Sequence, residues 1–203
     1  MVYLLKPVNC PYDPEEPLPT PLGFISLNRC FPGADDLKRE YKPVPANLVY
    51  PRMDVGGDRP MPDCFYTQLD YFFVSSRFRS VLEEFARGQV EYIEVELTMP
   101  AQKKPADAYY FINILGRSQL MNWELSQKRS RGVGFHFLDG TPDKWVMRSP
   151  TVDHVAIWHE IDHIEKDETF FGSGTRVFVT DGLGDALDVA FPGQCRLRQI
   201  QEM

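Results

Sequence analysis

The sequence predicts an α/β (α+β) fold: a mixed sheet with two strand–helix–strand units, preceded by a proline-rich irregular N-terminal arm. Three observations support this prediction. Residues 73–93 and 178–198 repeat one pattern of apolar residues without a gap. The first 66 residues hold 12 of the 17 prolines. Hydrophobic residues make up 43% of the 203-residue chain, which is enough for a sizeable core.

The first unit contains clear signals for each of its elements. The apolar run "YFFV" (71–74) predicts a buried strand. Ser75 or Ser76 can cap the helix that follows, because a short hydroxyl side chain accepts a hydrogen bond from a first-turn amide. Gly88 is expected to end this helix, and "VEYIEVEL" (90–97) alternates as a half-buried strand does. The apolar face of the helix has helical spacing and comprises Phe78, Val81, Leu82 and Phe85.

The second unit repeats the first at an offset of 105 residues. Neither unit can bury its helix alone, so we expect both helices to pack on one sheet. Chance similarity is the alternative, and the ungapped apolar register argues against it. The identical residues are Phe73, Val74, Leu82, Gly88 and Gln89 in the first unit, and Phe178, Val179, Leu187, Gly193 and Gln194 in the second.

The prolines divide the chain into a predicted arm (1–66) and a predicted domain (67–203). Proline removes a backbone donor and interrupts helices, so we expect the arm to be extended or looped and packed on the domain. No apolar run is long enough to span a bilayer, and the N-terminus does not read as a signal peptide. The four cysteines form no C-x-x-C pair, which favours reduced thiols in a cytosolic protein, with a Cys10–Cys30 disulfide as the alternative.

The net charge of −7 is confined to one segment. Residues 151–188 hold nine acids and two bases, and the rest of the chain holds 20 of each. A field of this kind attracts a basic partner and speeds its encounter, whereas it repels nucleic-acid backbones. A solvated acidic face that aids solubility is the alternative.

The same segment contains "HEIDH" (159–163), which matches the H-E-x-x-H pattern of zinc peptidases. That pattern works on a helix, where His159 and His163 would share one face and Glu160 would polarise water. Against a peptidase, the segment alternates as a strand does, Asp162 adds a charge inside the motif, and no further ligand is evident downstream. A structural zinc site that includes His154 is a second possibility. Surface residues of a strand or loop are the favoured interpretation.

The other motifs give no catalytic site. "GLGDAL" (182–187) resembles a dinucleotide-binding loop, but Leu187 replaces the last glycine, and Asp181 and Asp185 would face the pyrophosphate. There is no phosphate-binding P-loop and no nucleophile motif. We therefore predict no catalytic residues, no metal and no cofactor, and a binding protein rather than an enzyme. The tryptophans are expected in the core or at an interface, with the core favoured; they are Trp123, Trp145 and Trp158.

Three segments resemble the eleventh family of immunity proteins of bacterial polymorphic toxin and type VI secretion effector systems. They are "YFFVSSRFRSVLEEFARGQVEYIEVEL", "AYYFINILGRSQLMNWELSQKRS" and "RVFVTDGLGDALDVAFPGQCRLRQI". The nearest match to the family's "Y-x-x-x-N" strand runs from Tyr110 to Asn113 and is one residue shorter. The resemblance covers about residues 66–200, leaves out the N-terminal arm, and weakens over 151–171.

This resemblance implies a cytoplasmic antidote that binds one cognate toxin, often a nuclease, and occludes its active site. From the acidic charge and the lack of a spanning apolar run we expect no nucleic-acid and no membrane partner, and the oligomeric state is left open. From the charge pattern, and not from the family, we expect the interface to include Trp158 as an aromatic anchor together with Glu160, Asp162, Glu165, Asp167 and Glu168. The alternatives are a zinc metallopeptidase and a regulatory binding module with no toxin partner.

Overall fold

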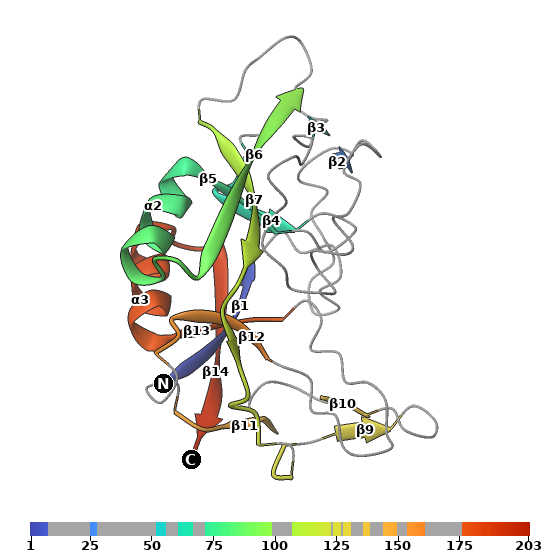
Figure 1. The fold of residues 1–203 in the computed structure, drawn as a ribbon, viewed down its shortest axis with the longest axis vertical. Coiled ribbons are helices and arrows are strands. Elements are labelled where there is room, and N and C mark those ends of the chain that lie inside the picture. Colours follow the sequence, from blue (N-terminus) through green and yellow to red (C-terminus); the bar gives the residue numbers. More distant parts are fainter. Residues whose placement is uncertain are drawn as a thin grey trace.

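The structure is a computed structural model, in which strands form a curved layer and two helices lie on the same face of it (Figure 1). Neither helix is long and apolar enough to cross a membrane, and the described residues form no other candidate span. The predicted mixed α+β class, with two strand–helix–strand units, is confirmed. The described residues are 1–7, 25–27, 52–55, 61–66, 72–98, 107–122, 124–126, 128–130, 136–138, 144–149, 154–160 and 176–203.

The first unit forms one six-stranded sheet with the strand order β2-β3-β6-β7-β5-β4. All neighbours in this sheet are antiparallel except β3 and β6, which are parallel. Its elements are β2 (Ile25–Leu27), β3 (Arg52–Val55), β4 (Cys64–Tyr66), β5 (Phe72–Ser75), α2 (Ser76–Phe85), β6 (Val90–Thr98) and β7 (Tyr109–Ile114).

The second unit forms another six-stranded sheet with the order β11-β14-β1-β13-β12-β8. A two-stranded sheet, β9 (Lys128–Ser130) with β10 (His136–Leu138), is separate from both. The elements of the second sheet are β1 (Val2–Pro7), β8 (Arg117–Ser118), β11 (Val146–Met147), β12 (Ile157–Glu160), β13 (Val177–Thr180), α3 (Asp181–Ala190) and β14 (Cys195–Glu202).

The two units share one strand register, so the sequence repeat is an internal symmetry of the structure. In the first unit β7 lies between β5 and β6, and in the second β1 lies between β13 and β14. The bonds that begin the helices also correspond: Ser76 N donates to Ala108 O over 2.9 Å, and Asp181 N donates to Met1 O over 3.0 Å. Matching cross-strand pairs are Val74–Tyr110 with Val179–Tyr3, and Val90–Ile114 with Cys195–Pro7.

Parts of the predicted N-terminal arm are regular strands of the two sheets. Residues 2–7 form β1, which pairs with β13 on one side and β14 on the other. Residues 64–66 form β4, the neighbour of β5. Both segments fall in the predicted arm (1–66), yet they are integral strands of the two sheets. The described residues at both ends of the predicted arm are thus paired with strands of the predicted domain.

Local signals fix the ends of both helices. Ser75 is the N-cap of α2, and its side chain accepts a hydrogen bond from the Phe78 amide over 3.2 Å, as predicted. Gly88 and Gly193 follow the helices at φ of 77° and 72°, a left-handed conformation in which other residues are strained. Both glycines thus direct the chain from each helix into the next strand.

A matched glycine pair tests this conformational requirement. Gly193→Ala is expected to lower the free energy of unfolding by about 1 kcal/mol, because alanine is strained at positive φ. Gly182→Ala is the control: its added methyl would meet the Phe85 ring at an ordinary 3.9 Å inside a helix, so stability should hold or rise. Urea unfolding of both variants measures the difference. Equal losses would contradict the role given to Gly193.

One apolar core joins the units beneath the helices. Phe78 of α2 stacks on Phe191, just after α3, with ring centroids 4.9 Å apart. A second cluster lies within the second unit and includes Trp158 and Phe178. The shared core contains the buried residues Leu5, Cys64, Tyr66, Phe72, Val74, Phe78, Leu82, Ala86, Val90, Ile112, Ile114, Ile157, Val177, Val179, Leu183, Leu187, Phe191 and Cys195.

Candidate interaction surface

Two symmetry-related glutamines form hydrogen bonds between the two units. Gln194, after α3, accepts a hydrogen bond at Oε1 from Asp63 N over 2.6 Å and donates from Nε2 to Asp63 Oδ2 over 3.0 Å. Gln89, after α2, accepts at Oε1 from Ala156 N over 2.8 Å and from Ile157 N over 3.2 Å. Asp63 leads into β4, which pairs with β5 of the first unit, and Ala156 leads into β12, which pairs with β13 of the second unit. The two units are therefore held together by reciprocal bonds.

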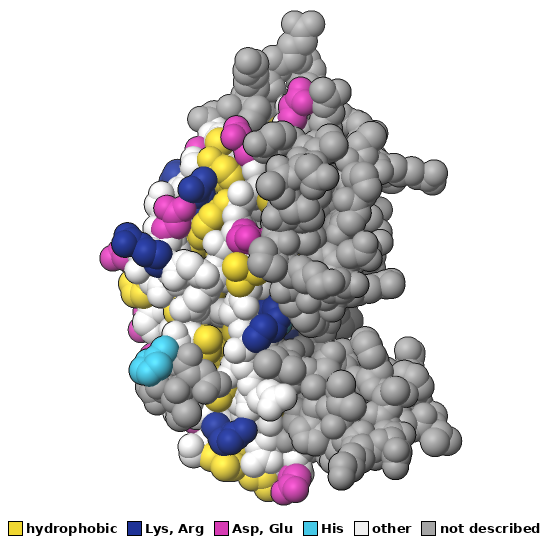
Figure 2. Space-filling view, in the orientation of Figure 1, with side chains coloured by type: hydrophobic (Ala, Val, Ile, Leu, Met, Phe, Trp, Pro, Cys, Tyr) yellow, Lys and Arg dark blue, Asp and Glu magenta, His cyan; other side chains and the backbone are white. Residues whose placement is uncertain are grey.

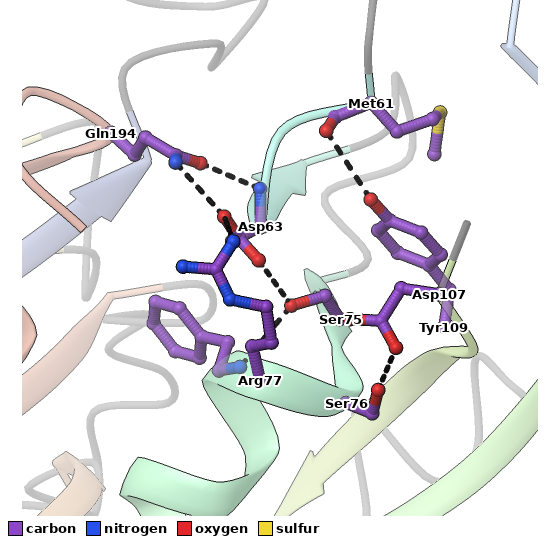
Figure 3. A network of polar contacts seen from close by, with 9 residues as sticks. Met61, Asp63, Ser75, Ser76, Arg77, Asp107, Tyr109 and Gln194 are labelled. Carbon is purple, nitrogen blue, oxygen red and sulfur yellow. Dashed lines mark hydrogen bonds and ion pairs between the residues drawn. The ribbon is translucent and has the colours of Figure 1, made fainter. Parts of the chain in front are cut away.

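Asp63 is the centre of the larger of these networks, shown in Figure 3. Its Oδ1 accepts a hydrogen bond from the Ser75 hydroxyl over 2.6 Å, and its Oδ2 lies 3.6 Å from Arg77 Nη1. Tyr109 lies nearby and donates its hydroxyl proton to Met61 O over 3.3 Å. Burial, and then the charge of Asp63, raises the pKa of Tyr109, so this hydroxyl stays protonated. Asp63 is only 8% exposed, and its contacts stabilise the junction between the units.

The exposed side of α3 carries the described part of the acidic segment. Asp181, Asp185 and Asp188 are all exposed, and their spacing places them along one side of the helix. Asp181 lies 3.5 Å from the N-terminal ammonium of Met1, so part of its charge is compensated. Among the described residues, none forms an ion pair with Asp185 or Asp188. Val189, beside them, is 83% exposed.

The symmetry-related helix α2 has a different charge. It carries Arg77 and Arg79, and Arg87 follows its end. Arg79 Nη2 lies 2.7 Å from Glu83, and its guanidinium covers the rings of Tyr92 and Tyr110. In Figure 2 acidic and basic side chains are intermixed over the upper left, where α2 lies. The two helices thus occupy equivalent positions in the fold but differ in charge. Helix α2 carries both acidic and basic residues, whereas α3 carries only acidic ones.

The predicted interface residues fall into three groups. Trp158 is 0% exposed and stacks on Phe178, with ring centroids 5.9 Å apart. Its ring lies in the core, the favoured alternative for the tryptophans, and cannot contact a partner in this conformation. Glu160 is the last residue of β12, and only its backbone is described. The remaining four, Asp162, Glu165, Asp167 and Glu168, lie outside the described residues.

The H-E-x-x-H pattern does not begin on a helix. His159 and Glu160 belong to β12, which pairs with β13 and β8. His159 Nδ1 lies 2.8 Å from Arg176 O, a backbone contact that occupies this nitrogen. His154 is exposed on a turn, and His163 lies outside the described residues. The strand interpretation is confirmed for residues 157–160, so the zinc-peptidase alternative lacks the helix that its geometry requires.

Metal removal offers a direct test of this segment. Within the described residues, no group of three or more His, Cys, Asp or Glu side chains is placed to hold a metal. We expect the melting temperature to stay unchanged when the protein is stripped with a chelator or supplied with zinc, in the wild type and in His159→Ala alike. A zinc-dependent rise in melting temperature that His159→Ala abolishes would restore the structural-zinc interpretation.

Comparison with known families favours one of the classes that the sequence left open. The model of the immunity protein family Imm11 matches residues 8–163, which is more than half of the chain. The chain belongs to the Imm11 family of immunity proteins. A search of curated proteins finds no match. An immunity protein acts by binding a toxin, so the partner of this Imm11 protein is a cognate toxin, and its family is one of inhibitors rather than catalysts.

The extent of the match corrects one expectation. The Imm11 match begins at residue 8 and so includes the proline-rich segment, which the resemblance seen in the sequence had left out. It ends at residue 163, before β13, α3 and β14. The match therefore covers β8, β11 and β12 of the second sheet but not β13, α3 and β14, which the internal symmetry relates to the first unit.

Proposed function

We propose that this Imm11 protein neutralises a nuclease toxin by covering the basic active site of the toxin with an acidic surface formed from residues 151–188. The observation that supports this proposal is the exposed acidic side of α3, because it belongs to the one segment that holds the whole net charge of −7. Glu160, Asp162, Glu165, Asp167 and Glu168 would extend this surface. Trp158, which is buried, has no part in it.

The electrostatic reason lies in what a nuclease must bind. Nuclease sites hold phosphates with lysine and arginine, so they carry positive charge. A row of carboxylates presents charges of the same sign as a phosphate backbone and competes for the same groups. Opposite charges also steer the two proteins together and raise the association rate. An inhibitor that works by occlusion acts stoichiometrically and needs no reactive group of its own. A protein that neutralises a nuclease inside the cell would act in the cytoplasm, and this location is part of the proposal.

A capture experiment followed by a growth assay tests this proposal. The tagged protein is incubated with lysate of its source bacterium at moderate salt, and the proteins that elute with rising salt are identified by mass spectrometry. We expect one stoichiometric partner with a basic nuclease domain. Expression of that partner alone should stop growth and degrade nucleic acid, and co-expression should prevent both.

Other outcomes separate the alternatives. A stoichiometric partner that is not toxic when expressed alone would support a regulatory binding module instead. A toxic partner without nuclease activity would retain the immunity function and remove the nuclease. A toxin whose capture does not weaken with salt would remove the acidic surface from the account.

A further inference from the structure

We propose that Cys64 and Cys195 are a thiol pair that a peroxide converts into a disulfide, which would link the two units covalently. Both thiols are free in the structure, and their sulfur atoms lie 3.3 Å apart. Cys64 lies in β4 of the first unit, and Cys195 begins β14 of the second. They are 131 residues apart in sequence, so their contact exists only in the folded chain.

Bonds of the preceding residues hold the two cysteines in place. Asp63 and Gln194, which come immediately before them, share the two hydrogen bonds of 2.6 and 3.0 Å described above. The Cys64 thiol also lies 3.6 Å from Gln194 O. The backbone of β4 is therefore fixed against that of β14 at this point. A sulfur–sulfur bond of about 2.05 Å requires the two atoms to approach by roughly 1.2 Å, within reach of side-chain rotation.

The internal symmetry shows that packing alone does not require sulfur here. Cys64 pairs with Val74 as Ile157 pairs with Val179, and Cys195 pairs with Pro7 as Val90 pairs with Ile114. Ile157 and Val90 are thus the symmetry-related counterparts of the two cysteines. They lie in the same core cluster as the cysteines. Aliphatic side chains therefore fill the equivalent position in the other half of the fold, and the thiols add a chemistry that the counterpart lacks.

The order of the reaction follows from exposure. Cys195 is 7% exposed and Cys64 is 0%, so a small peroxide reaches Cys195 first. The Cys195 sulfur takes one oxygen from the peroxide to give a sulfenic acid and one water. The Cys64 sulfur then displaces that oxygen, which leaves as a second water with the Cys64 proton. Two thiols are oxidised, and one hydrogen peroxide is reduced to two waters. Burial raises the pKa of the Cys64 thiol and keeps it protonated at rest, so Cys64 must release its proton as it attacks the sulfenic sulfur in the second step.

The test uses a chain in which only this pair can react. In a Cys10→Ser/Cys30→Ser background, hydrogen peroxide should lower the intact mass by about 2 Da, the loss of two hydrogens. Peptide mapping should find Cys64 joined to Cys195 within one chain. The melting temperature should rise by roughly 5–10 °C, because the crosslink constrains the unfolded chain, and dithiothreitol should reverse both changes. If the background variant does not fold, peptide mapping of the wild-type chain gives the same answer.

Two valine variants are matched controls. Cys64→Val and Cys195→Val copy the aliphatic character of the symmetry-related residues, so both should fold. With peroxide, Cys64→Val should gain oxygen on Cys195, Cys195→Val should react more slowly because Cys64 is fully buried, and neither should show a rise in melting temperature. The proposal is overturned if the unsubstituted pair is oxidised to sulfinic acid, if it crosslinks only between chains, or if it stays unmodified even in urea just below the unfolding transition. It is also overturned if a valine variant shows the same thermal gain.

Discussion

Trp158→Ala is expected to lower the free energy of unfolding by about 3–5 kcal/mol, the cost of emptying a large aromatic site in a packed core. The side chain is fully buried, stacks on Phe178, and shares its cluster with Trp145 and Ile200. Chemical denaturation followed by circular dichroism measures the loss. An effect of this size would leave little of the stability of an ordinary domain, so the variant is measured at low temperature.

Val189→Ala is the matched control for this experiment. Val189 is 83% exposed, and its truncation should change the free energy of unfolding by less than about 0.5 kcal/mol. Trp158→Phe keeps a ring in the core and should cost less than alanine. Unchanged stability in Trp158→Ala, together with a large loss of toxin affinity, would contradict the core position and return Trp158 to the interface.

Charge reversal on the proposed surface is expected to slow toxin association by about 10- to 100-fold at low salt, since electrostatic steering contributes rate enhancements of this order. The informative variants are Asp185→Lys/Asp188→Lys on α3 and Glu165→Lys/Asp167→Lys/Glu168→Lys. The association rate of each variant should also depend less on ionic strength than that of the wild type. Stopped-flow or surface-binding kinetics over a range of salt concentrations measure both effects.

A reversal on the other helix separates local from global charge. Glu84 is exposed on α2, in the symmetry-related helix, and Glu84→Lys changes net charge in the same direction. If the acidic segment is the docking surface, this change should have little effect on the rate. If the association rate falls equally per unit of charge at both helices, the rate depends only on the net charge of the protein and not on a local docking surface. No slowing in either acidic variant would remove this surface from the account.

The strand–helix–strand units could be predicted because their signals are local. The N-cap at Ser75, the glycine at 88 and the alternation in "VEYIEVEL" each act within a few residues, and all three are found in the structure. Because the second unit repeats the first, the same elements could be predicted there, including the glycine that follows the helix, Gly193. Short-range backbone and periodicity rules were sufficient for this part of the fold.

The place of β1 could not be predicted in this way, because it depends on partners almost two hundred residues away. Val2 pairs with Ile200, and nothing local in "VYLLKP" marks it as the counterpart of β7. The proline-rich residues that follow favoured an irregular arm instead. The glutamines at 89 and 194 were visible as identical residues of the repeat, but their reciprocal bonds to the opposite unit depend on the tertiary arrangement.

The candidate site was predicted only in part, for two physical reasons. Charge is a property of sequence, so the acidic segment was evident, and α3 places its described acids on the surface. Burial is decided by packing, and Trp158 is an aromatic beside acids in sequence whose ring nevertheless points into the core. The H-E-x-x-H pattern could not be interpreted from sequence for a similar reason. It can bind zinc as in a peptidase only on a helix, and the structure shows that its first two residues lie in a strand.

The most direct test of the central claim is the growth of cells that express the captured toxin together with this protein. We expect that the wild-type protein restores growth, that it binds the toxin at a one-to-one ratio, and that the acidic-surface variants restore growth less well although they remain folded. Failure of the folded wild-type protein to protect cells from any toxin it binds would contradict the immunity function itself. Full protection by every acidic-surface variant would retain that function and contradict the proposed surface.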